Sequence, residues 1–373
     1  MNLSYWEWKS WLTNISYTIV GSGIVGLSCA LYLKRKYPKA TVLIIEQGVM
    51  PQGASTKNAG FACFGSLSEI LDDLKHHTEE EVLALVKQRV SGLNLLKQTL
   101  GEETIGYKHY GGYELFMQSE TDTFANCLDQ RDTINKLLYP VFNAPVFSLK
   151  ENSFGFKTIK NNYVYNAFEG QLDTGKLMTA LLQKVQSSGI KILNNVTVKA
   201  LSDSGNSVQI QTNRFTFDSQ KVCIATNGFA SQLLHTEHVK PARAQVLITK
   251  PISNLHFKGT FHIDKGYYYF RNINNRVLFG GGRHLDFKTE ETTEFGQTPV
   301  IQNKLEELLR TVILPTTPYE IDYRWSGIMG VGNKKKPMLK QVSNNVYCGV
   351  RLGGMGIAIG SLIGKELADL TTR

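Results

Sequence analysis

The chain has 373 residues, of which 42% are hydrophobic and 20% charged, and its formal net charge is +9 at pH 7. This length predicts two domains, and the composition is typical of a soluble globular protein. The sequence disfavours a membrane-spanning protein, since no apolar run approaches the ~20 residues required. It also disfavours nucleic-acid binding, since the basic residues are dispersed except at Lys334–Lys336.

The N-terminal 14 residues mix three tryptophans with charged residues and lack the continuous apolar stretch of a signal peptide. We interpret them as an aromatic arm that packs on the folded domain. Contact of Trp6, Trp8 and Trp11 with a membrane surface is the alternative. The five cysteines, at positions 29, 63, 127, 223 and 348, have neither disulfide nor metal-ligand spacing. They predict reduced thiols in a cytoplasmic protein without a metal site.

The most informative segment runs from Ser16 to Glu46. A β-branched apolar run is followed by Gly21, Gly23 and Gly26, and then by apolar residues at helical spacing. In a dinucleotide-binding turn such glycines allow a tight turn, close approach of a pyrophosphate and close helix packing. Glu46 ends a second strand about 20 residues later, where an acid binds a ribose hydroxyl. An acid there disfavours a 2′-phosphate, so the predicted ligand is FAD or NAD(H).

A loop rich in small residues, Gln47–Gly65, follows this segment. A long ordered loop beside a nucleotide fold is usually functional. Its hydroxyl and amide groups, on Ser55, Thr56 and Asn58, could bind a ligand. Ala59 and Gly60 would let the backbone come close to that ligand.

Helical periodicity predicts four further helices, at Ser68–Leu100, Asp122–Leu138, Asp173–Val185 and Thr298–Thr311. Apolar and alternating runs predict the strands. In chain order these lie at Tyr107–Met117, Phe156–Phe168, Gly189–Val198, a hairpin at Val208–Phe217, Lys221–Ile224, Arg243–Thr249, Gly266–Arg271, Arg276–Gly281 and Ile321–Gly327. The strand at Gly189–Val198 is expected to be the third of a doubly wound sheet.

A second glycine turn lies near the C-terminus. The strand Asn345–Arg351 leads into the turn Leu352–Gly356 and then into a predicted helix, Ile357–Leu370. A simple NAD dehydrogenase needs one such turn, whereas the isoalloxazine of FAD must be held separately. Backbone N–H groups at a helix start can stabilise negative charge on a reduced flavin. A plain helix entry is the alternative.

Four motifs, in the same order, give the chain a family resemblance. They are Gly21–Gly26 with Glu46, Gly53–Gly60, Tyr268–Arg271 with Val277–Gly282, and Gly349–Gly360. In these motifs the sequence resembles the FAD-dependent oxidoreductases of the D-amino-acid oxidase superfamily, which includes glycine, sarcosine and γ-glutamylputrescine oxidases. The motifs span almost the whole chain.

The resemblance implies an α/β protein with a Rossmann-like FAD-binding domain interleaved with an α+β substrate domain built on a mixed sheet. The expected FAD-binding domain comprises residues 1–105, 170–240 and 326–373. The expected substrate domain comprises residues 106–169 and 241–325. The FAD is expected to be non-covalent, since superfamily members with covalent flavin use a cysteine before the final strand and Asn333–Met338 contains none.

Carried over by motif, Ser55, Asn58 and Gly60 would lie near the pyrophosphate and ribityl chain, and Val198 would contact adenine through its backbone. Thr226 and Gly228 would lie near the ADP moiety, and the residues of the second glycine turn would border the flavin. The full set of expected cofactor-binding residues is Gly21, Gly23, Ile24, Val25, Gly26, Glu46, Gln47, Ser55, Thr56, Asn58, Ala59, Gly60, Phe61, Val198, Ala225, Thr226, Gly228, Arg351, Gly353, Gly354, Met355, Gly356 and Ile357.

The family oxidises a C–N bond of an amine or amino acid by hydride transfer to flavin N5, with hydrolysis of the imine and common reoxidation by dioxygen. Such a site needs a cation for the substrate carboxylate, and an arginine suits that role because its fork is bidentate. Arg271 is the first candidate, followed by Arg283 and Arg324. Tyr268 and Tyr269 alternate along a strand, so at most one should face the flavin.

Three histidines, His109, His262 and His284, have no clear partner in the sequence and are interpreted as structural. Two other enzyme functions stay open. One is a flavin dehydrogenase of a 2-hydroxy acid that passes electrons to a quinone or carrier, and the other is a tRNA-modifying flavoenzyme. A non-catalytic flavin-binding subunit is a further alternative. The expected partners are a small amine or amino-acid substrate and O2 or an electron carrier, without nucleic acid or stable membrane insertion.

Overall fold

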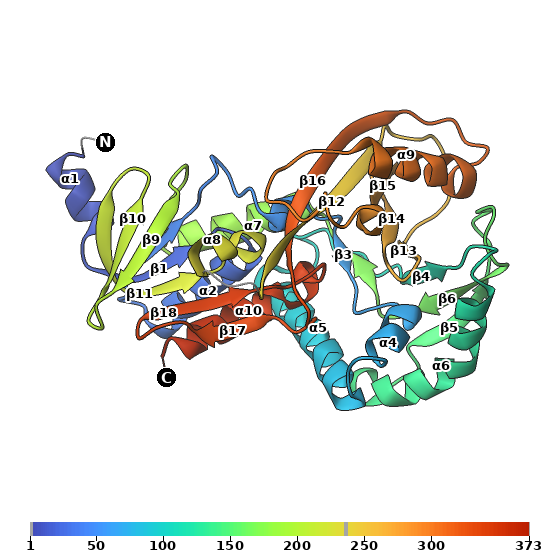
Figure 1. Cartoon of the computed structure of the whole chain (residues 1–373), viewed down its shortest axis with the longest axis horizontal. Helices are drawn as coiled ribbons and strands as arrows, with labels where there is room; N and C mark the ends of the chain where they lie inside the picture. Colours follow the sequence, from blue (N-terminus) through green and yellow to red (C-terminus); the bar gives the residue numbers. More distant parts are fainter. Residues whose placement is uncertain (1–2, 235–237, 373) are drawn as a thin grey trace.

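The computed structural model describes residues 3–234 and 238–372, which form two sheet-based lobes (Figure 1). The first lobe is built on a sheet with the strand order β17-β18-β11-β1-β2-β8, extended by the hairpin strands β10 and β9. Its strands are β1 Ile15–Val20, β2 Val42–Ile45, β8 Lys191–Leu193, β9 Val198–Asp203, β10 Val208–Thr212, β11 Thr216–Ile224, β17 Met338–Gln341 and β18 Val346–Val350.

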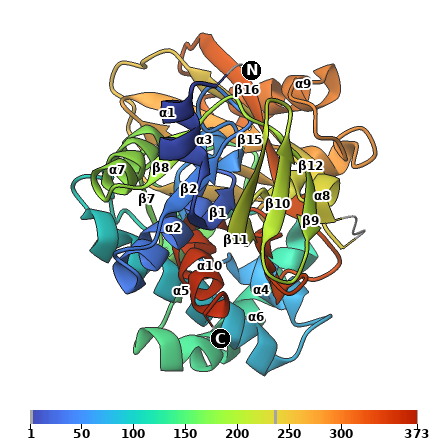
Figure 2. The same cartoon turned by 90° about the vertical axis from the view of Figure 1, so that its left-hand side faces the viewer.

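Parallel pairing joins β8, β2, β1, β11 and β18, as expected of a dinucleotide-binding fold. Four helices pack together beside this sheet around a shared apolar core, and Figure 2 shows α2 and α10 next to β1. They are α2 Ile24–Lys36, α5 Glu79–Leu100, α7 Thr174–Ser187 and α10 Gly356–Leu370. Asp173 caps α7 by accepting from the N–H of Lys176 at 3.0 Å, which confirms the predicted helix start.

The second lobe is built on a sheet with the strand order β16-β12-β15-β14-β13-β4-β6-β5. Only the contact of β13 with β4 is parallel among its pairs, so this sheet is mixed. Its strands are β4 Gly112–Leu115, β5 Phe147–Glu151, β6 Asn162–Asn166, β12 Lys240–Thr249, β13 Thr260–Ile263, β14 Tyr268–Ile273, β15 Arg276–Gly281 and β16 Ile321–Val331. An aromatic core and the helix α9, Pro299–Leu308, cover one face.

The predicted fold class is therefore confirmed: a Rossmann-like sheet is combined with a separate mixed sheet. The chain enters the second sheet twice, from residues 112–166 and from residues 240–331. The exact domain boundaries stay a prediction. The remaining elements are the long helix α6 Thr121–Phe142, which joins β4 to β5, and several short ones. The short elements are α3 Ala54–Lys57, β3 Phe61–Ala62, α4 Leu67–Asp73, β7 Gly170–Gln171, α8 Ser231–Leu234, the 3₁₀ turns η2 Asn227–Phe229 and η3 Arg283–Leu285, and the π-helical turn η4 Leu309–Ile313.

Several predicted elements were wrong in extent. The helix expected over Ser68–Leu100 is two helices, because Thr78 starts α5 with a capping box to Glu81. The strands expected at Tyr107–Met117, Phe156–Phe168 and Gly189–Val198 are reduced to β4, β6 and β8, while β5, β9, β13 and β17 were missed. Each of these four strands has six residues or fewer, which leaves little periodic signal.

The aromatic arm does not pack as expected. Tyr5–Glu7 form a short helix, α1, and Trp8–Leu12 a π-helical turn at the far end of the first lobe (Figure 1). Trp6 is 70% exposed, and Leu12 is the residue of this turn that enters the core. Within the described residues, no helix combines the length and apolarity needed to cross a bilayer.

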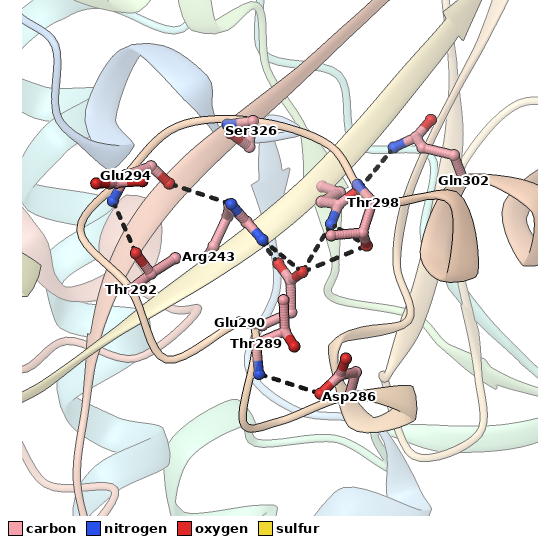
Figure 3. A network of polar contacts seen from close by, with 11 residues as sticks. Arg243, Asp286, Thr289, Glu290, Thr292, Glu294, Thr298, Gln302 and Ser326 are labelled. Atoms are coloured by element: carbon pink, nitrogen blue, oxygen red, sulfur yellow. Dashed lines mark hydrogen bonds and ion pairs between the residues drawn. The ribbon is translucent and has the colours of Figure 1, made fainter.

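A buried polar network holds the segment that follows β15. Arg243 on β12 donates from Nε and a terminal nitrogen to the two carboxylate oxygens of Glu290, each at 2.8 Å (Figure 3). Gln245 also donates to Glu290, and its own oxygen accepts from the N–H of Thr298 at 3.0 Å. The hydrogen bonds to Glu290 raise the pKa of the Arg243 guanidinium above its ordinary value. These contacts anchor the segment 286–298, which follows Arg283 in the chain, on the second sheet.

Candidate functional site

A cavity of about 540 Å³ lies where the two sheets meet. Its wall contains both glycine turns, the small-residue loop at 53–61, the end of β11 and one face of the second sheet. Ligand pockets of this size are typical of small-molecule and cofactor sites. The two glycine turns are more than 320 residues apart in the sequence, yet they border one space.

The three glycines of the first turn differ in what surrounds them. Gly21 has φ +105°, and a Cβ on Gly26 would lie 2.0 Å from the Gly21 carbonyl oxygen, so both positions exclude side chains for reasons of the fold. A Cβ on Gly23 would meet only the side chain of Ser55, with the hydroxyl at 2.8 Å. The space next to Gly23 is therefore open to a ligand and not filled by the protein backbone.

Glu46 lies at the end of β2 on the cavity wall. Its Oε2 accepts from the backbone N–H of Ser22 at 3.0 Å and from the Ser22 hydroxyl at 2.6 Å. Its Oε1 accepts from the N–H of Gly48 at 3.0 Å. Ser55 in turn accepts from the N–H of Ile24 at the start of α2, at 3.0 Å. The carboxylate is thus held in one orientation beside the glycine turn.

The loop at 53–61 is held by its own side chains and by Arg271. The Asn58 side chain accepts from the N–H of Gly60 at 2.8 Å and from the hydroxyl of Thr174 at 2.9 Å. Arg271 on β14 donates to the carbonyl of Ala59, and to the carbonyl of Leu172 at 2.9 Å. Gly60, with φ +76°, leaves room for the guanidinium, since a Cβ there would lie 2.5 Å from it.

The structure places the first candidate for the substrate carboxylate, Arg271, outside the cavity. Its side chain is 2% exposed and does not line the cavity, and its guanidinium nitrogens donate hydrogen bonds to backbone carbonyls. Burial lowers the pKa of Arg271 to about 10, and the charge of Asp173 offsets part of that effect. Arg324 is also occupied, with hydrogen bonds to Gln302 at 2.6 Å and Glu306 at 2.7 Å. Arg271 therefore holds the loop at 53–61, whereas Arg324 is an exposed residue away from the cavity.

Replacing Arg271 by methionine is expected to weaken cofactor binding rather than substrate binding. The change leaves two buried carbonyls without their donor, at a cost of about 1–3 kcal/mol each, and loosens the loop at 53–61. The dissociation constant for FAD, titrated into apoprotein, should rise at least about tenfold. Arg324→Met is the matched control and should leave FAD affinity unchanged. An unchanged FAD affinity with a raised KM for carboxylated substrates would contradict this role for Arg271.

The second glycine turn faces the cavity with little side-chain cover. Arg351 and Gly353 have φ of +64° and +58°. Asn227, which follows β11, links this turn to the end of that strand. Its side-chain oxygen accepts from the N–H groups of Arg351 at 3.1 Å and Leu352 at 3.2 Å. A Cβ on Gly354 would meet only the Met329 sulfur, at 3.9 Å. The turn therefore presents open backbone to a ligand.

Two cavity residues have a buried polar atom without a partner among the described residues, namely Oγ1 of Thr226 and Nε of Arg89. The hydroxyl of Thr226, at the end of β11, has no hydrogen bond within the described residues. Buried polar groups in native structures nearly always have a partner. A bound ligand is the simplest source of that partner.

Three arginines, Arg89, Arg283 and Arg351, line the cavity, and none has a carboxylate partner among the described residues. Arg89 and Arg351 donate to backbone carbonyls, whereas the guanidinium of Arg283 has no hydrogen bond among those residues. Arg283 follows β15 and lies 4.7 Å from the centre of the Phe287 ring. Burial lowers its pKa. Tyr269 lines the same cavity, whereas Tyr268 packs into the aromatic core, and burial raises the pKa of both to about 12. The two side chains thus alternate as expected, and Tyr269 is the one that borders the cavity.

Most of the predicted site residues line this cavity. Those that do not are Gly26, Thr56, Gly60, Gly228, Tyr268, Arg271 and Arg324. Gly26, Gly60 and Gly228 instead allow close packing behind the wall, and Thr56 hydrogen-bonds the carbonyls of Pro51 and Gly53. Sequence reasoning missed several lining residues, since no local motif marks them. They include Lys57, Cys63, Glu69, His262, Lys265, Tyr267 and Met329.

Comparisons with known proteins agree with this architecture. A family model described as "FAD dependent oxidoreductase" matches residues 16–370. The chain is 21% identical to the probable oxidoreductase OrdL of Haemophilus influenzae, over 96% of this chain and 84% of that protein. It is also 21% identical to the gamma-glutamylputrescine oxidoreductase of Escherichia coli, over 94% of this chain and 82% of that protein.

Solved structures give the same result for the fold. Glycine oxidase from Geobacillus kaustophilus superposes with a TM-score of 0.76 at 20% identity, covering 96% of this chain and 94% of that chain. L-proline dehydrogenase from P. horikoshii superposes with a TM-score of 0.74 at 19% identity, covering 96% and 93%.

Proposed function

The chain belongs to the family of FAD-dependent oxidoreductases, and on that premise we propose that it oxidises the C–N bond of an amino acid or amine. The observation that carries this proposal is the partly buried guanidinium of Arg283, which has no hydrogen bond among the described residues and lies in the same cavity as both glycine turns. The relatives support it, since their names include an amine oxidoreductase, a glycine oxidase and a proline dehydrogenase.

The residues present fit FAD. Gly23 leaves a cradle that a side chain would fill, Glu46 is oriented for a ribose hydroxyl, and Thr226 has an unpaired hydroxyl. We propose that these groups hold the ADP half non-covalently. The second glycine turn would hold the flavin, because it presents open backbone N–H groups at the start of α10.

Bound FAD supplies the acceptor for a hydride from the substrate carbon, while the nitrogen loses a proton and water hydrolyses the resulting imine to a carbonyl and an amine. In this scheme Arg283 binds the substrate carboxylate bidentately and sets its orientation. Tyr269 stays a neutral phenol at pH 7, since burial raises its pKa to about 12. It forms a rigid wall of the site and can donate a hydrogen bond.

Anaerobic bleaching of the yellow protein tests the proposal. Amino acids, N-methyl amino acids, amines without a carboxylate and 2-hydroxy acids would be compared, with products identified afterwards. Bleaching by an amino compound with release of ammonia or amine supports C–N oxidation. Bleaching by 2-hydroxy acids alone, with an oxo acid as product, would instead establish the dehydrogenase alternative.

Replacing Arg283 by leucine is expected to raise KM for carboxylated substrates about 10- to 100-fold, because a hydrogen bond to a charged group contributes about 1.5–3 kcal/mol. FAD retention should not change. Arg310→Leu, at an exposed position, is the matched control. An equal loss with amines that lack a carboxylate would show that Arg283 does not bind that group.

A further inference from the structure

One row of side chains crosses the second sheet toward the cavity. His262 on β13 pairs directly with Glu114 on β4 and with Tyr269 on β14, and Tyr269 pairs with Gly280 on β15. Directly paired residues point to the same face of a sheet. Gly280 leaves room for the Tyr269 ring, which a Cβ there would meet at 2.8 Å. His262 and Tyr269 consequently share the cavity wall.

His262 is held by a buried acid. Its Nε2 lies 3.0 Å from Oε2 of Glu169, and the two residues are 5% and 1% exposed. Glu169 is itself fixed by the hydroxyl of Thr260 at 3.2 Å and the side-chain amide of Asn166 at 3.4 Å. The Phe61 ring packs edge-on against the imidazole, with 5.4 Å between centroids. The ring therefore has one defined orientation.

The other imidazole nitrogen is unused. Nδ1 has no hydrogen-bond partner among the described residues. It is also absent from the set of unpartnered atoms that have no accessible surface, so a ligand can reach it. Glu114, the acid on the neighbouring strand, has no hydrogen bond to the imidazole, and its oxygens accept instead from Ser66 at 3.0 Å and from the N–H and hydroxyl of Ser68. Because His262 lines the cavity, a cavity ligand is the partner that remains.

We infer that His262, oriented by Glu169, is a specificity-determining residue whose Nδ1–H donates to an uncharged oxygen of the substrate, such as that of an amide or hydroxyl group. This inference rests on the proposed function only in placing the substrate carboxylate at Arg283. The strand that precedes Arg283, β15, is two positions from β13, which is about 10 Å across the sheet. The two side chains can thus hold two separate groups of one substrate.

The surrounding charges favour an uncharged acceptor over a second carboxylate. The acids around His262 come from three different elements, with Glu69 on α4, Glu114 on β4 and Glu169 before β7. Cys63 lies on the same wall and its thiol stays protonated, since burial raises its pKa. Burial raises the pKa of Glu114 to about 7, but Glu169 and Glu69 by themselves offset one imidazolium, so the ring has no excess positive charge of its own for an anion.

The protonation state supports a donor at Nδ1 under ordinary conditions. Burial alone would lower the pKa of His262, but the charge and hydrogen bond of Glu169, with Glu69 and Glu114, raise it to about 9. Below that pH both ring nitrogens carry hydrogen. Above it Nε2 keeps its hydrogen for Glu169, so Nδ1 becomes an acceptor and the donor to the substrate is lost.

Binding of amine-free ligands to the FAD-loaded protein tests the inference. Succinamate and glutaramate carry an amide, 4-methylpentanoate and 5-methylhexanoate are their apolar isosteres, and succinate carries a second carboxylate. The ligands would be titrated by calorimetry or by perturbation of the flavin spectrum. These compounds have no oxidisable amine, so the result is independent of whether the protein oxidises C–N bonds.

At pH 7.5 at least one amide ligand is expected to bind about tenfold more tightly than its isostere, and succinate is expected to bind more weakly than succinamate. His262→Gln keeps a donor for Glu169 but removes the one at Nδ1, so the amide preference should disappear while the apolar ligands bind as before. His262→Asn places a donor near Nδ1 and should restore part of the preference. The wild-type preference should fall as pH rises through about 9.

If the His262 variants fail to fold, a Glu169→Gln variant provides a second test of the inference. It keeps an acceptor for Nε2 but removes the charge, so the amide preference should be lost at a lower pH. Three results would overturn the inference. They are an amide preference that His262→Gln leaves unchanged, tighter binding of succinate than of succinamate, and a shifted spectrum of the resting flavin in His262→Gln, which would assign Nδ1 to the cofactor.

Discussion

Gly23→Val is expected to fold and to lose its FAD. A Cβ at this position would meet only the Ser55 side chain within the protein, and rotation of that hydroxyl away from Ile24 would let the folded chain accommodate it. Its side chain would then occupy the space where a pyrophosphate approaches the helix start. We expect purified protein without yellow colour, and a melting temperature equal to that of wild-type apoprotein.

Gly26→Val is the matched contrast. Its side chain would collide with the Gly21 carbonyl, 2.0 Å from an ideal Cβ, and neither backbone segment can move away without breaking the turn. This variant should fail to fold, whether or not FAD is present. A Gly23→Val protein that keeps a full complement of FAD would show that the pyrophosphate lies elsewhere.

Glu290→Ala is expected to lower the free energy of unfolding by about 3–5 kcal/mol, because it leaves the buried guanidinium of Arg243 without its counterion. Glu290 is fully buried, and both of its oxygens accept from Arg243 (Figure 3). Urea denaturation of the apoprotein measures the effect. The segment after Arg283 should also loosen, so KM for carboxylated substrates should rise.

The neighbouring acid provides the control. Glu291 pairs with Lys240 at 3.0 Å, and both side chains are about half exposed. Glu291→Ala should cost about 1 kcal/mol or less, as for other exposed ion pairs. Equal losses for Glu290→Ala and Glu291→Ala would mean that the buried network contributes no more than a surface ion pair.

The two arginine candidates show where sequence reasoning reached its limit. Arg271 and Arg283 are both close to the β14–β15 hairpin, and their sequence contexts offer no reason to prefer the second. Arg271 is directed toward the loop at 53–61, and no local sequence pattern links it to that loop, because 212 residues separate it from Ala59. His262 and Glu169 were missed as a pair for the same reason, since 93 residues separate them.

The sequence by itself determined the family, the Rossmann-like fold, FAD as the cofactor and both glycine turns. These properties depend on residues close together in the chain, where glycine conformation, strand periodicity and helix starts act locally. Only the tertiary structure decided which cation, histidine and tyrosine share the cavity. Their proximity arises from the pairing of strands and loops separated by tens to hundreds of residues, and no local energy term in the chain encodes that choice of partners.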